Sequence, residues 1–381
     1  MSKGTVIALV IAGVLVTAGL VLGAVAMANG LSTADTRYTK KVTTLDSAVT
    51  ALTVLTADED VRILPASDGA CRVEAWESDK LTFAVETDGT TLNVREIDNR
   101  TWLDRVGLHF GWLSGEQRGV AVYLPGALDT LTVETSSGSV RAENQTVRGA
   151  ASVKTTSASI RIDMLRAGSL TATATSGSIR LYHIQTAGKV EANGVSGSVT
   201  LENVQAEAIT VSATSGSLKL SEAKADGAIE VKGASGSITV EDAACRALTA
   251  TATSGSVRVR GSRAASDPTE IGATSGSVTV EDCTFRDAAI HATSGSVRVN
   301  DTTAGDLHLN AKSGSVHFEN LDASSLTIKA TTGSVSGSLA HAMRFDAHAT
   351  TGSVSIPASS GDAPCTIETT SGSIRVTVKG E

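Results

Sequence analysis

A serine follows a small turn residue at thirteen places in this chain, a pattern that supplies either nucleophiles or hydrogen-bonding turns. The signature is Ser/Thr-Gly-Ser, and it recurs roughly every 20 residues from Ser137–Ser139 to Ser371–Ser373. The sequence has no Gly-x-Ser-x-Gly elbow, and a catalytic site is not repeated identically along a stack of units. We therefore expect these serines to form ladders of hydroxyl groups at repeated turns.

The other residues that carry chemistry do not cluster in the sequence. The four cysteines are Cys71, Cys245, Cys283 and Cys365, without Cys-x-x-Cys spacing. Cys245 and Cys283 are expected about two coils apart, beyond disulfide reach, and a disulfide that involves Cys71 stays open. No His, Asp and Glu group has metal-ligand spacing, and pairs such as Glu281-Asp282 have poor geometry for acid–base work. The sequence thus predicts no catalytic residue, no metal, no cofactor and no enzyme activity.

The elements that would position these residues follow from the repeat. With the turn residue as position 0, position +2 is a branched aliphatic residue in all thirteen copies, from Val140 to Ile374, and position +4 is nearly as strict. Positions −7, −5 and −3 alternate in the same way, as in Leu170–Ala174. Such alternation predicts strands with one buried face, and a fixed period of this length is typical of solenoids. We predict an all-β, single-handed parallel β-solenoid of about thirteen coils over residues 131–381.

Glycine at position 0 is expected to supply a backbone conformation with φ > 0. Ala158 is the exception, and we expect strain of roughly 1 kcal/mol or a relaxed turn there. The predicted structural turn residues are Gly138, Gly177, Gly197, Gly216, Gly236, Gly255, Gly276, Gly295, Gly314, Gly333, Gly352 and Gly372.

The exposed positions show a second period that spans two coils. Position +3 runs Arg180, Thr200, Lys219, Thr239, Arg258, Thr279, Arg298, His317, and position +5 carries acidic residues in alternate coils, from Glu202 to Glu319. Because equivalent residues stack about 4.8 Å apart, alternation separates like charges and places opposite charges side by side. This pattern and a net charge of −8 argue against a continuous basic stripe for nucleic acid.

Residues 1–30 predict a transmembrane anchor, and residues 31–44 a linker. Thr5–Ala28 carries no charge and, at about 1.5 Å per residue, is long enough to span a bilayer as a helix. A cleaved signal peptide ending near Ala26–Ala28 is the alternative, although its apolar region would be unusually long. The expected orientation places the solenoid on the extracytoplasmic side of the cell membrane.

Residues 45–130 predict an irregular β cap. Strand-like runs cover Ala51–Leu55, Val61–Leu64, Cys71–Trp76, Leu81–Glu86 and Thr91–Glu96, and a solenoid needs a cap over its open strand edges. Aromatic residues are rare elsewhere in the chain. Trp102, Phe110 and Trp112 are therefore either a partner contact or a plug for the end of the solenoid.

The anchor, the run Val120-Ala121-Val122-Tyr123-Leu124-Pro125 and the Thr-Ser-Gly-Ser-hydrophobic units together resemble the bacterial toastrack-type family, catalogued as candidate adhesins. The resemblance covers about Leu45 to Val378. It implies a membrane-anchored extracytoplasmic β-solenoid of unknown function, often encoded near phage-shock or envelope-stress membrane proteins. It supplies no catalytic residues.

Two functions remain after these exclusions. The first is a non-enzymatic interaction module of the bacterial envelope, which binds another membrane protein or a wall component and is linked to envelope-stress sensing. The second is a cell-surface adhesin or structural spacer whose height carries a tip toward the cell wall or a host surface. Unusual surface near 101–113 favours the first, and unusual surface near Ser336–Pro364 favours the second. A polysaccharide-degrading β-helix enzyme is disfavoured because the turns are short and uniform.

Overall fold

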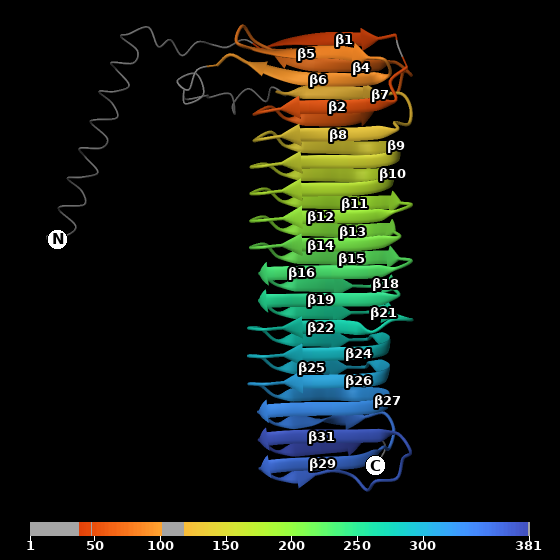
Figure 1. The fold of residues 1–381 in the computed structure, drawn as a ribbon, viewed down its shortest axis with the longest axis vertical. Coiled ribbons are helices and arrows are strands. Elements are labelled where there is room, and N and C mark those ends of the chain that lie inside the picture. The colour runs from red at the N-terminus through yellow and green to blue at the C-terminus, as the bar shows by residue number, and fades with distance from the viewer. Residues whose placement is uncertain (1–37, 47, 101–117, 380–381) are drawn as a thin grey trace, which may run out of the picture.

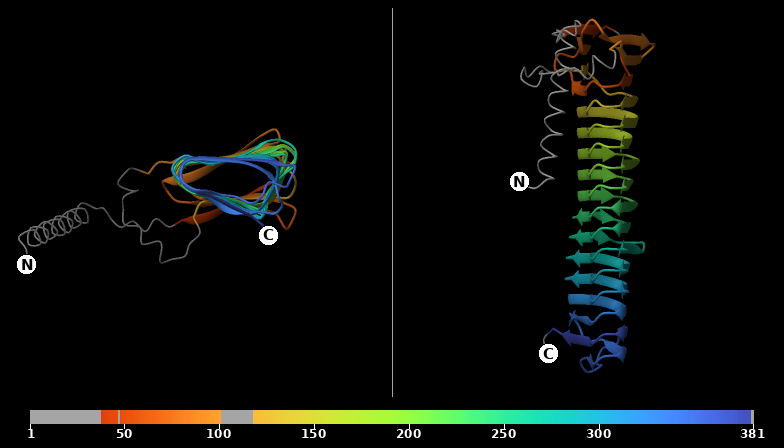
Figure 2. Two further views of the ribbon diagram at one scale, coloured as in Figure 1. Left: turned by 90° about the horizontal axis from the view of Figure 1, so that it is seen from below. Right: turned by 90° about the vertical axis from the view of Figure 1, so that its left-hand side faces the viewer.

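The computed structural model describes residues 38–46, 48–100 and 118–379, and within these ranges it contains strands and no helix. The strands form one tall stack (Figure 1), whose coils superpose in a flattened outline when viewed along the stack (Figure 2). The predicted all-β parallel solenoid is thus confirmed, and the thirteen signatures bound about twelve full turns.

The strands of the N-terminal part are β1 (Thr39–Leu45), β2 (Ala51–Thr56), β3 (Val61–Pro65), β4 (Cys71–Glu77), β5 (Leu81–Asp88), β6 (Thr91–Asp98) and β7 (Val120–Leu124). The next strands are β8 (Thr130–Thr135), β9 (Val140–Thr155), β10 (Ile160–Ala174), β11 (Ile179–Thr186), β12 (Lys189–Gly194), β13 (Val199–Ala206), β14 (Ala208–Ala213), β15 (Leu218–Ala225), β16 (Ala228–Ser235), β17 (Ile238–Glu241), β18 (Ala244–Cys245), β19 (Ala247–Ser254) and β20 (Val257–Arg260). The last are β21 (Arg263–Ala264), β22 (Thr269–Ala273), β23 (Val278–Glu281), β24 (Thr284–Ala292), β25 (Val297–Asn300), β26 (Thr303–Ala311), β27 (Val316–Thr332), β28 (Val335–Leu339), β29 (Arg344–Thr351), β30 (Val354–Ser355), β31 (Pro364–Ser371) and β32 (Ile374–Val378).

The core is a set of straight columns of aliphatic side chains. Val140, Ile160 and Ile179 are register partners in adjacent parallel strands, and each is at most 1 % exposed. Burial of such a side chain contributes about 1.5–3 kcal/mol relative to leaving it in water. The same position in every later coil repeats this contact, so the aliphatic period in the sequence becomes a continuous core.

The five strands predicted between residues 45 and 100 are present as β2 to β6, and the predicted linker 31–44 ends in β1. Strands β1 and β4, β4 and β7, and β5 and β6 pair in antiparallel fashion, whereas the rest of the stack is parallel. The N-terminal end therefore differs from the repeated coils in containing antiparallel strand pairs.

The order of the coils in space differs from their order in the chain at both ends. Strand β2 pairs with β6 and β8, and β3 pairs with β7 and β9, so the coil of β2 and β3 lies between the coil of β6 and β7 and the coil of β8 and β9. At the other end β31 pairs with β27 and β29, and β32 pairs with β28 and β30. Strands β29 and β30 therefore form the distal tip. The last coil of the chain, β31 and β32, lies between this tip and the coil of β27 and β28.

The expectation that the turn glycines have φ > 0 is wrong for most of them. Among the twelve repeat glycines, a positive φ of 135° to 154° occurs at four: Gly236, Gly333, Gly352 and Gly372. A Cβ on Gly255 would lie 2.6 Å from the carbonyl carbon of Gly236 in the preceding coil, and closer still to its oxygen. At Gly255 it is this close approach of the preceding backbone, and not a positive φ, that leaves no room for a side chain.

The left-handed conformation occurs instead at position +6, where the chain turns a corner. Nine non-glycine residues have φ between 47° and 56°, and they are Asn144, Met164, His183, Asn203, Glu222, Asp242, Asp282, Asp301 and Asn320. Asn and Asp tolerate this conformation best among residues with a Cβ, and they fill six of these positions. An Asn or Asp six residues after the turn glycine therefore indicates this corner in the sequence, although the glycine repeat is the more obvious pattern.

Ala158 adopts the same turn as its glycine counterparts. Its N–H donates to Thr155 Oγ1 at 3.2 Å, as the N–H of Gly138 donates to Thr135 Oγ1 at 3.1 Å, and its φ is not positive. We expected strain or a relaxed turn at Ala158 because a positive φ was assumed there, and that assumption is wrong for this residue.

The serine ladder is present at position +1 in several coils. The N–H of Ser315 donates to Ser296 Oγ at 3.3 Å, and the N–H of Ser334 donates to Ser315 Oγ at 3.2 Å. Each of these hydroxyls satisfies a backbone donor of the next coil.

Replacement of Gly255 by Ala is expected to lower the free energy of unfolding by about 1–3 kcal/mol, because the new methyl group must displace the Gly236 carbonyl. The matched control is Gly126→Ala, since a Cβ at Gly126 meets nothing within 4 Å. Urea unfolding of both variants measures the difference. Equal losses in the two variants would contradict the close approach.

Replacement of Glu222 by Asn is expected to raise the free energy of unfolding by about 0.5–1 kcal/mol, because Asn adopts φ near 51° with less strain. The control is Glu207→Asn, an exposed position without positive φ. Thermal unfolding should show a gain only at residue 222, and an equal response of both variants would argue against a strained corner.

Candidate interaction sites

The predicted partner contacts Trp102, Phe110 and Trp112 lie outside the described residues, as does the predicted anchor Thr5–Ala28. Within the described part of the chain, no helix is long and apolar enough to cross a membrane. The structure does describe the residues at which both of these segments join the stack.

A buried ion cluster fixes the residue that precedes segment 101–117. The Arg100 side chain is 12 % exposed and binds Asp98 through two hydrogen bonds, from Nε at 2.8 Å and from Nη2 at 3.1 Å. Arg100 Nη1 also lies 3.3 Å from Glu59 Oε1. The hydrogen bond to Asp98 raises the pKa of Arg100, so the guanidinium stays charged although it is buried.

Two buried glutamates complete this cluster. Burial raises the pKa of Glu59, and Arg100 offsets part of that effect. Glu96 Oε2 accepts hydrogen bonds from the N–H of Ala57 at 2.6 Å and of Asp58 at 3.2 Å. The cluster therefore joins the end of β6 to the turn between β2 and β3.

The residue that follows segment 101–117 meets the start of the described chain. The guanidinium of Arg118 lies over the ring of Tyr38, 4.7 Å from its centroid. Next to it, the N–H of Val120 donates to the Asp60 carbonyl at 2.8 Å. We call Tyr38, Glu59, Arg100 and Arg118 the proximal junction. The two described residues that flank segment 101–117 thus lie at the same end of the stack as Tyr38, the first described residue.

A shallow hollow of about 340 Å³ lies on the face formed by strands such as β16, β19 and β22. It exists because Gly272 takes a place where neighbouring coils carry side chains, Thr251 and His291. The His291 ring covers Gly272, since a Cβ there would lie 2.9 Å from His291 Cδ2. Lys232, which pairs with Glu230, lines the far side.

The distal tip exposes residues that the repeat buries elsewhere. Phe345, Ala347 and Ile356 are half-buried and Val354 is 42 % exposed, because no further coil covers them among the described residues. Ser359 shields part of the open edge, since its Oγ accepts the N–H of Phe345 at 3.0 Å. Deeper in the stack, Gly337 accommodates Phe318, whose ring would lie 2.5 Å from an added Cβ.

The four cysteines are free and buried, which closes the question of a Cys71 disulfide. Burial raises the pKa of Cys245 and of Cys283 to about 11 and that of Cys365 to about 12, so these thiols stay protonated near neutral pH. No group of three or more His, Cys, Asp or Glu residues in the described ranges could hold a metal ion.

The predicted charge alternation produces ion pairs between coils. Lys219 Nζ lies 3.3 Å from Glu241 Oε2, and Arg258 Nη1 lies 3.7 Å from Glu281 Oε2. Each pair joins a basic residue at position +3 to an acidic residue at position +5 of the next coil. These pairs are exposed and individually weak, so they offset repulsion more than they stabilise the fold.

The sequence matches the family described as Toastrack DUF4097 over residues 49–270 and 229–377. The chain belongs to the toastrack family. This match covers the parallel coils and most of the N-terminal strands. Among curated proteins, no relative matches this toastrack chain significantly.

Solved structures give only distant likenesses. A candidate cell adhesion protein from Clostridium sporogenes is 10 % identical with a TM-score of 0.28, covering 54 % of this chain and 99 % of its own. A candidate lipid binding protein from Parabacteroides distasonis is 13 % identical with a TM-score of 0.22, covering 89 % and 96 %. A candidate adhesin from Bacteroides fragilis is 11 % identical with a TM-score of 0.19, covering 89 % and 98 %. These scores are too low to support an inference about function.

Replacement of Glu59 by Gln is expected to reduce the loss of stability with rising pH. Because burial raises the pKa of Glu59, its contribution is greatest below the unfolded value of 4.5 and falls as pH rises through the higher native pKa. Urea unfolding between about pH 4 and pH 8 measures this slope. The exposed Glu86→Gln is the control, and an unchanged slope in the Glu59 variant would contradict the assignment.

Proposed function

We propose that this toastrack protein is a non-enzymatic interaction module, anchored in the membrane of a bacterial envelope with its solenoid on the extracytoplasmic side. Its partner is another envelope membrane protein, and the interaction serves envelope-stress sensing. Trp102, Phe110 and Trp112 supply the contact.

The contact between Tyr38 and Arg118 carries this proposal. Tyr38 follows the predicted anchor by ten residues, from Ala28, and Arg118 directly follows the aromatic segment. A chain of ten residues reaches at most about 35 Å, so the junction stays close to the membrane surface if Thr5–Ala28 spans it. The aromatic segment is then held where a membrane partner can reach it.

The ion cluster supports the same role. Arg100 is held by Asp98 and Glu59, and the side chains of all three are at most 12 % exposed. A rigid attachment reduces the entropy that a binding segment loses when it meets a partner. The cluster therefore suits a segment that is presented for binding.

The distal tip favours a second candidate function, that of an adhesin or spacer. Val354 and Phe345 present apolar surface at the end of the stack opposite to the proximal junction. At about 4.8 Å per coil, twelve turns place this tip on the order of 60 Å away from the junction. A contact there would serve attachment to a distant surface.

The test places a photo-crosslinking residue at Trp102 or at Trp112 of the full chain in native membranes, with a third variant that carries it at Thr249. Mass spectrometry then identifies the crosslinked partners. We expect a neighbouring membrane protein to be captured from the two tryptophan positions and not from Thr249, which lies in β19 in the middle of the stack.

A fourth variant with the crosslinker at Val354 decides between the two functions. Capture of wall or foreign-surface material only from Val354 would favour the adhesin or spacer. Capture only of other copies of this chain from every position would overturn the interaction module.

A further inference from the structure

One row of exposed side chains runs the length of the stack without a carboxylate. It is position +3, where register partners follow one another from β9 to β32. We define the basic row as Arg141, Arg161, Arg180, Lys219, Arg258, Arg298 and Arg375. Thr, Ser and His fill the intervening places, so every residue in the row is a potential hydrogen-bond donor.

The row is not a product of the repeat alone. Arg141, Arg161 and Arg180 are direct register partners in β9, β10 and β11, about 4.8 Å apart. Like charges at this spacing repel each other, and the alternation of later coils avoids it. Glu143 and Asp163 offset part of this repulsion at Arg141 and Arg161, whereas Arg180 has no ion pair among the described residues and stays available to an anionic ligand.

Several cations of the row have no carboxylate partner in the described part of the molecule. Three of the cations form ion pairs: Arg141 with Glu143, Lys219 with Glu241 and Arg258 with Glu281. A fourth, Arg161, is more distant, with its Nη2 atom 3.9 Å from Asp163 Oδ2. Asp163 is shared with His183 Nδ1 at 2.9 Å. The cations without an ion pair among the described residues are Arg180, Arg298 and Arg375.

The serine ladder borders the basic row and adds donors. The Oγ atoms of Ser277, Ser296 and Ser315 accept N–H groups from the next coil, and each hydroxyl also carries one hydrogen that it can donate. The carboxylates of position +5 lie on the other side of the row. A ligand is thus directed to the strip between the serines and the basic row.

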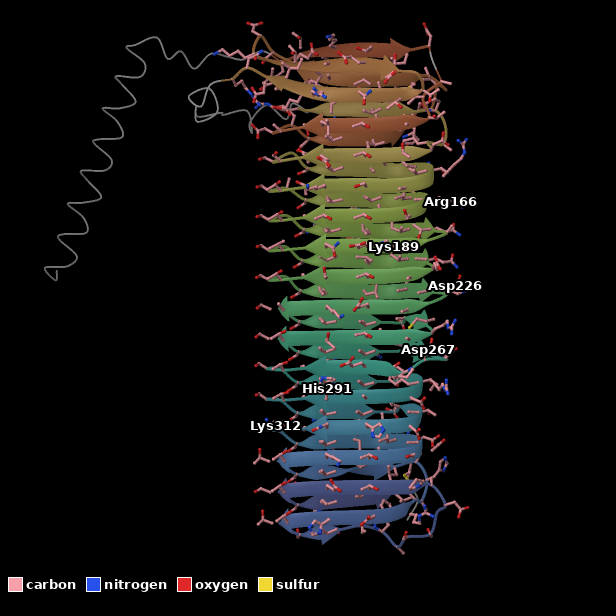
Figure 3. The ribbon with its side chains drawn as sticks, in the orientation of Figure 1. Arg166, Lys189, Asp226, Asp267, His291 and Lys312 are labelled. Carbon is pink, nitrogen blue, oxygen red and sulfur yellow. The ribbon has the colours of Figure 1, made fainter. Side chains whose placement is uncertain are left out.

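We propose that this strip binds a linear acidic polysaccharide laid parallel to the solenoid axis. The strip is straight and roughly 50 Å long, from eleven steps of about 4.8 Å between Arg141 and Arg375. Figure 3 shows the side chains in straight rows along the stack. An extended glycan chain can follow such a line, and its carboxylates and hydroxyls meet guanidinium and hydroxyl donors in turn.

The spacing favours a polysaccharide over a nucleic acid. From Arg180 to Arg298 a cation recurs in every second coil, which matches a polymer with one acidic sugar in two. The phosphates of a duplex spiral away from a straight line. Single strands are bound through rows of stacked aromatic residues, and position +3 has none in the described coils.

The test measures binding of fluorescent hyaluronan, a linear polysaccharide with a carboxylate on every second sugar, to the full chain at low salt. The variant Arg180→Thr/Arg298→Thr/Arg375→Thr uses the residue that the row itself carries at Thr200, Thr239 and Thr279, so the fold should be retained, and a thermal melt checks this. We expect Kd to rise by at least about tenfold and wild-type binding to weaken as salt is raised.

The matched control is Lys154→Thr/Lys232→Thr/Lys329→Thr, which removes the same charge from the opposite sheet. It should change Kd by less than about twofold. The reverse variant Thr200→Arg/Thr239→Arg/Thr279→Arg should bind more tightly than wild type.

Three results would overturn the proposal. They are an equal rise in Kd in the arginine triple variant and the lysine triple variant, no binding by the wild type, and tighter binding of a DNA duplex than of hyaluronan. The strip is a different surface from the proximal junction, so the crosslinking experiment can fail while this one succeeds.

Discussion

The close approach of one backbone turn to the next is the constraint on which the rest of the structure depends. At Gly255 the carbonyl group of the preceding coil occupies the space of a side chain, and the same geometry recurs at Gly197, Gly276 and Gly295. Because the turns are in contact, adjacent strands keep one register from coil to coil. The aliphatic columns, the serine ladder and the rows of surface charge all follow from that register.

The structure departs from the repeat at the two ends of the stack. At the proximal end, antiparallel pairing and the Arg100 cluster replace the repeated turn, and two chain segments enter side by side. At the distal end, strands β29 and β30 form the tip and pair with β31 and β32, the last coil of the chain. The regular coils in the middle of the solenoid set the distance between the two ends. They also keep the rows of charged side chains straight.

The parallel solenoid, the buried positions and the strands from β2 to β6 could be predicted because each rests on a local alternation of residue types. The conformation of the turn could not, since a glycine required for close approach and one required for positive φ look alike in sequence. The informative signal was the Asn or Asp at position +6, as in Asn144 and Asp282.

The coil order at the two ends was also out of reach of the sequence. Each coil offers the same register to its neighbour, so Ile374 fits beside Val335 as well as Val354 would. The proline-containing stretch between Val354 and Cys365 was the one hint of an interruption. The proximal junction was missed because Tyr38, Glu59, Arg100 and Arg118 are far apart in the chain and share no motif.

A high-resolution crystal structure of the full chain that resolves the backbone at Gly255 and at Glu222 tests most directly whether backbone contact sets the stack. We predict that φ at Gly255 is not left-handed and that its Cα lies against the Gly236 carbonyl. We also predict a left-handed φ at Glu222. A left-handed Gly255 with open space around it, together with an ordinary φ at Glu222, would contradict the claim that backbone contact sets the stack.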